Sequence, residues 1–279
     1  MRMLHRSFVP VWLFVAGFLW ASPPFRKDTR AFDPPETQRI HAHASSVVEL
    51  PNGDLFAVWY ENGPSHPSYE YMKDADKRDD VRIGGARLAR GRSVWSPPFV
   101  ASDTFGVSDN NPALALDRQN RLWLIHPTLI GVPQRTWGSA LLTYKVSSDY
   151  RKPGPPRWDR ESVLIVRAKG LDEVVKKAVE AARARFGSSP QAETRVKTIL
   201  ERLEDPFARR LGWMPRVHPL ILDDGAVLVP FANENFNVAA FALTRDGGQT
   251  WTFSNVVPGW GITQPTVVKL ADGKLAAFF

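Results

Sequence analysis

The sequence predicts an all-β fold built from one repeated unit. Three observations predict it: a hairpin pattern that occurs four times, a short turn motif between strands, and a composition with 10 Trp and 23 Pro among 279 residues. β-Rich proteins with many turns use these residues more often than helical bundles do. Repeats of this kind are typical of β-propellers, in which four-stranded blades stand around a central axis.

The repeated unit is an apolar run, a turn rich in Asn, Asp and Gly, and a second apolar run. Such turns need a residue with positive φ, which Gly adopts most easily and Asn next. Gly53, Gly225 and Gly273 hold that position in three copies, and Asn120 holds it in the other. Each copy therefore predicts a β-hairpin, and the copies cover residues 46–59, 112–125, 219–231 and 265–279.

A turn motif follows the third hairpin, with the form Ser/Thr-x-Asp-x-Gly-x-Thr-Trp, and is an Asp box. Its spacing has a local reason. The Asp accepts backbone N–H bonds inside a tight turn, the Gly takes a conformation closed to other residues, and the Trp covers the turn. A hairpin, a strand, this turn and another strand together predict a four-stranded blade. The residues of the motif are Thr244, Asp246, Gly248 and Trp251, and degenerate versions lie at residues 91–97 and 147–149.

A segment of different character interrupts the repeats at residues 170–211. Leu171, Val175 and Ala178 are among its apolar residues at helical spacing, surrounded by Lys, Arg and Glu. A break precedes Pro190, which suits an early position of a second helix. The segment predicts a helical hairpin. It either packs on the propeller edge or forms a lid or specificity element beside the binding mouth.

The N-terminus has the layout of a secretory signal. Basic residues precede an apolar run at residues 8–20, and small residues follow it. This run is shorter than a typical transmembrane helix. We therefore predict residues 1–24 as a signal peptide of a secreted or periplasmic protein, or as an uncleaved N-terminal anchor, and residues 25–279 as the propeller. Contact with a membrane is expected only if the segment is not cleaved.

The charge and the missing Cys residues limit the classes of partner and site. The net charge of +7 favours anionic partners such as nucleic acid, anionic glycans or lipid headgroups. The basic residues are scattered and no phosphate-binding Gly-rich loop is present, so we predict no nucleic-acid partner. The absence of Cys excludes disulfides and thiolate metal sites. His41 and His43 share a strand face without a third ligand, so we predict no metal and no cofactor.

The hairpins, the Asp box, the sequence of residues 43–53 and the segment 210–219 after the helical insertion resemble the sialidase (neuraminidase) superfamily. More narrowly, they are similar to bacterial sialidase-like proteins with BNR repeats. The resemblance covers the chain from about residue 37 to its end. It implies a six-bladed propeller, about four blades of which are visible here, that hydrolyses terminal sialic acid of glycans without a cofactor. The same fold also serves lyases and binding proteins.

The resemblance also implies roles: arginines bind the substrate carboxylate, an Asp is the acid/base, and a Tyr with a Glu partner is the nucleophile. Arg216 starts the third inner strand and suits the carboxylate. His43 stands where the family has its first carboxylate-binding Arg, and His is a weaker, pH-dependent anion binder. Glu234 lies in the region of the Glu. Asp80 lies in the region of the acid/base Asp, or else belongs to a solvated run of charged residues at 73–82. Glu61, after the second strand of the first repeat, is a third catalytic candidate.

Four further residues are candidates for contact with a sugar. Arg135 and Trp137 lie on a loop beyond the second hairpin that we expect near the mouth, where the Trp either stacks on a sugar ring or packs in the protein. Asn111 and Gln264 immediately precede the inner strands of the second and fourth repeats, and their amides suit sugar hydroxyls.

The resemblance places the Tyr nucleophile in a late blade, and no Tyr follows the Asp box. The fourth hairpin ends inside its second strand, so we expect an incomplete propeller. The leading hypothesis is a sialidase-like exo-glycoside hydrolase acting on terminal anionic sugars of glycans, present as a fragment without the nucleophile blade. The alternatives are a polysaccharide lyase on uronate-containing glycan, which His43 favours, and a non-catalytic glycan-binding propeller.

Overall fold

The computed structural model describes residues 30–31, 41–63, 75–131, 135–187, 189–216, 218–259 and 261–279. The predicted signal segment, residues 1–24, lies outside these ranges, so export stays a prediction. Across the described ranges, no helix has the length and apolar character needed to cross a bilayer.

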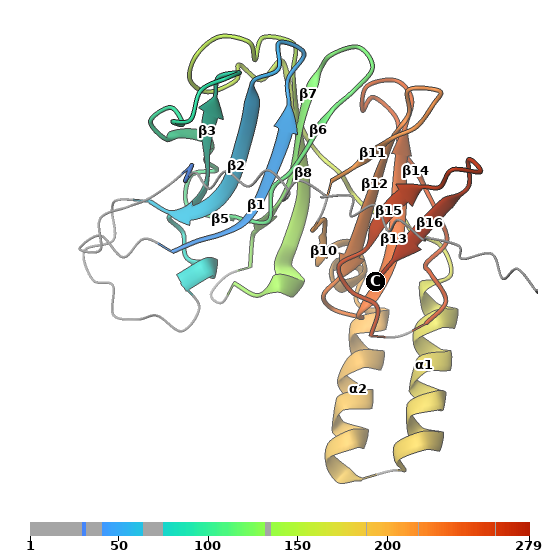
Figure 1. Ribbon diagram of the computed structural model, residues 1–279. Helices are drawn as coiled ribbons and strands as arrows, with labels where there is room; N and C mark the ends of the chain where they lie inside the picture. Colours follow the sequence, from blue (N-terminus) through green and yellow to red (C-terminus); the bar gives the residue numbers. More distant parts are fainter. Residues whose placement is uncertain are drawn as a thin grey trace, which may run out of the picture.

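Four antiparallel sheets follow one another along the chain, and each begins at its innermost strand (Figure 1). Blade 1 contains β1 (Ala42–Glu49), β2 (Leu55–Asn62), β3 (Val81–Leu88) and β4 (Phe99–Ser102). In blade 2 the inner strand is split into β5 (Ser108–Asp109) and β6 (Ala113–Leu116), beside β7 (Leu122–Leu129), β8 (Ala140–Ser147) and β9 (Arg160–Val163).

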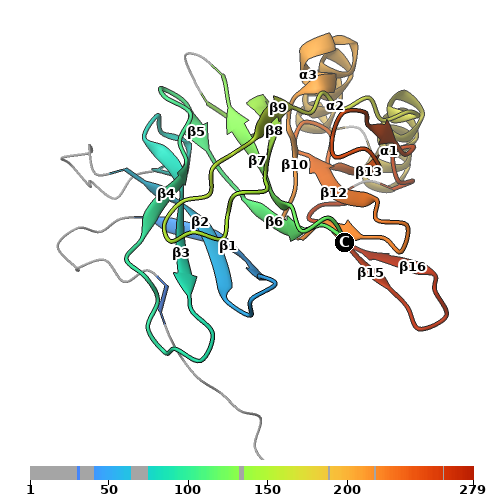
Figure 2. The ribbon, with the colours of Figure 1, turned by 90° about the horizontal axis from the view of Figure 1, so that it is seen from above.

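Blade 3 repeats the split, with β10 (Trp213–Met214) and β11 (Leu220–Ile221) beside β12 (Val227–Asn233), β13 (Val238–Thr244) and β14 (Thr252–Phe253). The pair β15 (Thr266–Lys269) and β16 (Leu275–Phe278) begins blade 4. Over the described residues the blades form an open arc, which Figure 2 shows from above. The predicted all-β, incomplete propeller is confirmed.

The four predicted hairpins share one turn. The turn residue with positive φ donates its N–H to the carbonyl three residues earlier, over 2.8 to 3.0 Å in every copy. The φ angle is 83° at Gly53, Gly225 and Gly273, and 56° at Asn120. This is a three-residue hairpin loop that ends in a left-handed residue. Local turn chemistry therefore sets the register of each inner pair.

Strand direction divides the loops between two ends of the molecule. The inner strands run toward the hairpin turns, and we call the end of the molecule that carries these turns the turn face. The opposite end, where the inner strands begin, is the mouth face. The loops between the second and third strands of a blade lie at the mouth face. The connections from one blade to the next lie there as well. The short helices η2 (Ala75–Lys77) and η3 (Trp137–Ser139) lie in such loops, and the helical insertion is such a connection.

The predicted helical hairpin is confirmed as α1 (Leu171–Phe186) and α2 (Pro190–Glu204), followed by the short α3 (Pro206–Arg210). The Ser189 side chain caps α2 by accepting the Ala192 N–H at 3.1 Å, and Pro190 is the first residue of that helix. The base of α1 is buried against blade 3, and its far end projects from the mouth face (Figure 1).

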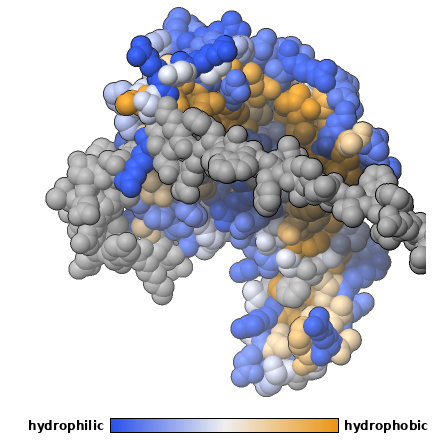
Figure 3. Space-filling model, in the orientation of Figure 1, coloured by the Kyte–Doolittle hydropathy of each residue, from blue (hydrophilic) through white to orange (hydrophobic). Residues whose placement is uncertain are grey.

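Apolar side chains fill the space between neighbouring blades. Phe56 and Ile83 of blade 1 share one cluster with Leu114 and Leu124 of blade 2. A second cluster joins blade 2, blade 3 and the base of the helical insertion. Polar residues cover the turns above these clusters, as Figure 3 shows in blue. Burial between blades is therefore the main hydrophobic contribution to the fold.

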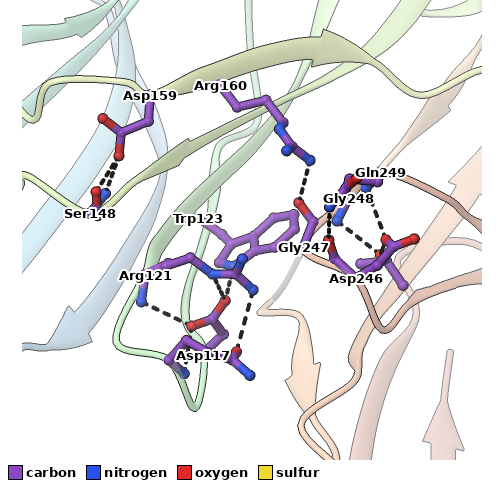
Figure 4. A network of polar contacts seen from close by, with 12 residues as sticks. Asp117, Arg121, Trp123, Ser148, Asp159, Arg160, Asp246, Gly247, Gly248 and Gln249 are labelled. Carbon is purple, nitrogen blue, oxygen red and sulfur yellow. Dashed lines mark hydrogen bonds and ion pairs between the residues drawn. The ribbon is translucent and has the colours of Figure 1, made fainter.

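On the turn face, the turn of residues 244–251 docks on blade 2 (Figure 4). The Tyr144 hydroxyl donates to the Gly248 carbonyl at 2.5 Å, and Arg160 Nη1 donates to the Gly247 carbonyl at 3.0 Å. The Trp251 ring stands edge-on to the Tyr144 ring at 5.4 Å. The turn thus sets the approach of blade 3 to blade 2.

Asp246 is held inside that turn by four hydrogen bonds. One carboxylate oxygen accepts the N–H groups of Gln249 and Thr250, both at 2.9 Å, and also the Thr244 hydroxyl at 2.9 Å. The other accepts the Thr250 hydroxyl at 2.6 Å. These bonds hold the pKa of Asp246 well below its usual range.

The substitution Gly248→Ala tests the docking of this turn. Gly248 has φ 87°, and an added Cβ would lie 2.8 Å from Tyr144 Cε2. The left-handed backbone costs an alanine about 1–2 kcal/mol, and overpacking adds about 1–3 kcal/mol. The matched control Gly91→Ala, at φ 74° with open space around the added Cβ, should lose only the stability that the left-handed backbone costs. Urea unfolding measures both, and equal losses would contradict the docking.

Candidate functional site

The inner strands share one irregular position on the mouth face. It interrupts the inner strands of blades 2 and 3, coincides with a register shift in β1 and lies just before β15. This position lies six residues before the residue whose carbonyl closes the hairpin turn. It is occupied by Ala44, Asn111, Arg216 and Gln264. Ala44, Asn111 and Gln264 have φ angles of 51°, 36° and 52°. Non-glycine residues rarely adopt this conformation, and it clusters at functional sites. The mouth is therefore the candidate site.

Arg216 is a cation at this mouth. Its Nη1 donates to Asn111 Oδ1 at 3.3 Å, and its buried Nε has no hydrogen-bond partner among the described residues. Its charge also acts on two neighbours, lowering the pKa of Tyr60 and of Glu234 against the opposite effect of burial. Arg216 thus has an N–H group that no described residue accepts.

Glu234 lies half-buried just after β12, as the sequence placed it. Burial raises the pKa of its carboxyl above the ordinary Glu value, and the nearby Arg216 charge offsets part of that rise. A carboxyl with a raised pKa keeps its proton to higher pH. It is therefore suited to donate a proton.

Three rings gather beside these groups. His43 Nδ1 and the Tyr60 hydroxyl are 3.1 Å apart, and the His41 ring lies 5.7 Å from the Tyr60 ring. Burial raises the pKa of Tyr60 to about 12, to which Asp76 contributes. Burial lowers the pKa of His41, while Asp76 acts in the opposite direction. The phenol therefore stays protonated near neutral pH.

Asp76 is the functional candidate that sequence reasoning missed. It lies in η2, and its carboxylate is close enough to influence the pKa of both His41 and Tyr60. Its backbone carbonyl accepts Asn110 Nδ2 at 2.7 Å. Asp76 belongs to the same run of charged residues before β3 as Asp80, and spacing along the sequence does not distinguish the acidic residues of that run.

Asp80 has different surroundings. One of its oxygens accepts Asn62 Nδ2 at 3.2 Å, and the other is buried without a hydrogen-bond partner among the described residues. Asn62 also donates to the Ala75 carbonyl at 3.0 Å. Asp80 thus helps to fasten the loop that carries Asp76.

Glu61 is buried and engaged through both carboxylate oxygens. One accepts Trp59 Nε1 at 2.6 Å, and the other accepts Arg82 Nη2 at 3.1 Å. Because neighbouring residues of a strand point to opposite faces, Glu61 and Tyr60 lie on different sides of β2. These contacts form a structural ion pair inside blade 1, and Glu61 takes no part in the reaction proposed below.

The remaining sequence candidates lie around the rim. Arg135 pairs with Asp79 and donates to the Gly106 carbonyl at 2.7 Å. Trp137 packs in a small cluster with Leu129, Ala140 and Met214, and Lys77 Nζ lies 5.4 Å from its ring centroid. Gln264 is exposed. Within the ranges that the structure describes, no three His, Cys, Asp or Glu side chains form a metal-binding group.

No protein-family model matches the sequence, and no curated protein matches it. Solved structures do match in fold. A protein of unknown function from Dyadobacter fermentans has a TM-score of 0.59 at 15% identity, over 86% of this chain and 62% of that one. The intramolecular trans-sialidase of Ruminococcus gnavus, in complex with oseltamivir carboxylate, has a TM-score of 0.58 at 11% identity, over 89% and 68%.

Zg3597, a family 117 glycoside hydrolase from Zobellia galactanivorans, has a TM-score of 0.55 at 11% identity, over 89% of this chain and 66% of that one. The likeness at these identities shows a sialidase-like propeller fold and nothing about activity. The chain spans 62% to 68% of the length of these three structures.

The substitution Glu61→Ala tests the structural interpretation of that residue. It leaves the Arg82 charge and the Trp59 N–H without their acceptor, so we expect a loss of about 2–4 kcal/mol of stability. The control Glu201→Ala, on the exposed surface of α2, should stay within about 0.5 kcal/mol. Chemical denaturation measures both, and a Glu61→Ala protein as stable as the control would contradict the ion pair.

A second prediction concerns the pH dependence of stability. Because the folded-state pKa of Glu234 is raised, the folded protein binds this proton more tightly than the unfolded chain. The contribution of Glu234 to the stability of the folded protein therefore falls as the pH rises from 4.5, the ordinary pKa of Glu, through the raised pKa of the folded state. The variant Glu234→Gln should lack this fall. Urea unfolding between about pH 4 and 7 compares the two proteins, and identical pH slopes would be the contrary result.

Proposed function

We propose that this chain carries part of the site of a sialidase-like exo-glycoside hydrolase that acts on a terminal sugar bearing a carboxylate. The observation that carries the proposal is Arg216, a half-buried guanidinium in the break between β10 and β11, with an Nε–H that no described residue accepts. A guanidinium binds a carboxylate through two parallel hydrogen bonds. The net charge of +7 favours the approach of an anionic glycan.

The hydrolysis needs a proton donor and a proton acceptor. The donor protonates the glycosidic oxygen while the bond from the anomeric carbon to that oxygen breaks, water adds to the anomeric carbon, and the acceptor takes the proton of the water. Glu234 suits the donor because burial raises its pKa. Asp76, from the neighbouring side of the mouth, suits the acceptor. We assign no covalent nucleophile.

A second candidate is a lyase acting on uronate-containing glycan, and the contact between His43 and Tyr60 favours it. In that reaction a base removes the proton from the carbon beside the carboxylate. The C–O bond at the next carbon breaks, a C=C bond forms, and the leaving oxygen takes a proton. His43 suits the base, and Tyr60, with a pKa of about 12, suits the donor.

Product analysis separates these reactions. Sialyllactose and an oligosaccharide of uronic acids are the probes. Free sialic acid supports the hydrolase, and an unsaturated product that absorbs in the ultraviolet supports the lyase. Saturable binding without turnover supports a glycan-binding propeller, which would overturn both enzymatic proposals.

The substitution Arg216→Ala tests the proposed carboxylate site. Loss of charge-assisted hydrogen bonds worth about 1.5–3 kcal/mol should lower kcat/KM by about 10- to 100-fold. Arg216→Lys should recover only part, because Lys keeps the charge without the planar fork. The control Arg118→Ala removes an exposed turn-face cation that pairs with Asp223 at 3.4 Å, and it should have no effect. Unchanged kcat/KM in Arg216→Ala would sink the site.

A further inference from the structure

Asn110 and Asn111 lie next to each other in the break between β5 and β6, and their side chains contact different neighbouring blades. The Asn110 side chain contacts blade 1, and the Asn111 side chain contacts blade 3. Both residues are buried, with exposed fractions of 0% and 2%. A polar side chain buried this completely has its contacts set by the fold.

On the blade 1 side, Asn110 fastens the loop that carries Asp76. Asn110 Nδ2 donates to the Asp76 carbonyl at 2.7 Å, and the Ser108 hydroxyl, 3.2 Å away, contacts the same carbonyl. The Ser108 hydroxyl also contacts Asn110 Oδ1 at 3.0 Å. The backbone of η2 is thereby tied to β5, and the position of the Asp76 carboxylate depends on blade 2.

On the blade 3 side, Asn111 holds the cation. Its Oδ1 accepts Arg216 Nη1 at 3.3 Å, and its Nδ2 donates to Met214 Sδ at 3.2 Å. Asn111 has φ 36° in the break between β5 and β6, and Asn tolerates positive φ better than most residues. The two adjacent side chains thus contact the blades on either side of blade 2.

We propose that Asn110 and Asn111 form a positioning pair that sets the separation of the Asp76 carboxylate and the Arg216 guanidinium across the mouth. The catalytic consequence rests on the proposed function, since a substrate held by Arg216 must present its reacting atoms to Asp76. A misplacement of about 1 Å can cost about 10²-fold in rate. Neither Asn needs to contact substrate.

The kinetic test uses Asn110→Ala, Asn111→Ala and the matched control Asn120→Ala, with a 4-methylumbelliferyl sialoside as the probe. Asn120 also has positive φ, at 56°, and lies in blade 2, but it is exposed on the turn face. Asn110→Ala should lower kcat by about 10- to 100-fold with little change in KM. Asn111→Ala should raise KM about 10-fold with a smaller loss of kcat. Asn120→Ala should change neither.

A second readout does not need activity. Among the residues that the structure describes, Asp76, His43 and Tyr60 face His41, and the Asp76 charge raises the pKa of His41. Displacing Asp76 should therefore shift the His41 titration, followed by NMR, to lower pH in Asn110→Ala, in the same direction as in Asp76→Asn. Asn111→Ala and Asn120→Ala should leave it in place.

The outcomes separate the two proposals. If the wild-type protein turns over no carboxylated sugar, the proposed function fails, and the His41 titration still decides the positioning. If Asn110→Ala does not fold, Ser108→Ala removes one of the two polar contacts to the Asp76 carbonyl and should give a smaller shift of the same sign. An unshifted His41 in both variants, or equal kinetic losses in Asn110→Ala and Asn111→Ala, overturns the positioning pair.

Discussion

The burial of apolar side chains between neighbouring blades is the constraint on which the rest of this structure depends. A single four-stranded sheet has two faces and covers neither alone, so the blades stack. Phe56 and Ile83 meet Leu114 and Leu124 across one interface, and a larger cluster joins blades 2 and 3 to the base of α1. This packing brings inner strands together around an axis. The contacts of Asn110 with Asp76 and of Asn111 with Arg216 span blades that these apolar clusters hold side by side.

The second constraint is the irregular position at the mouth end of the inner strands. The hairpin turns set the register at one end, and residues with positive φ depart from the strand conformation at the other. Ala44, Asn111 and Gln264 have this conformation without the freedom of glycine. The strain is local, of order 1–2 kcal/mol at each position. It is offset by the pairing and packing of the same strands.

Burial also explains the electrostatics of the mouth. Removal from water raises the pKa of Glu234 and Tyr60 and lowers that of His41, so each group favours its neutral form. Arg216 acts against this trend on Glu234 and Tyr60, and Asp76 acts against it on His41. One cation and one anion from different blades therefore act against the effect of burial on these groups. Among them, Glu234 is the group that the proposed hydrolysis uses as its proton donor.

The sequence by itself determined the secondary-structure elements and their turns. Hairpin turns, the Asp246 turn and the helical hairpin follow from local patterns, because turn chemistry and periodicity act over a few residues. It also indicated Arg216 and Glu234 as groups of the mouth. Only the tertiary structure decided which acidic residue of the charged run approaches the rings, and it brought Asp76 there while Asn62 engaged Asp80. It likewise enclosed Glu61 in an ion pair and tied Asn111 to Arg216. These roles depend on contacts between side chains far apart in sequence, and the spacing of residues along one chain does not encode them.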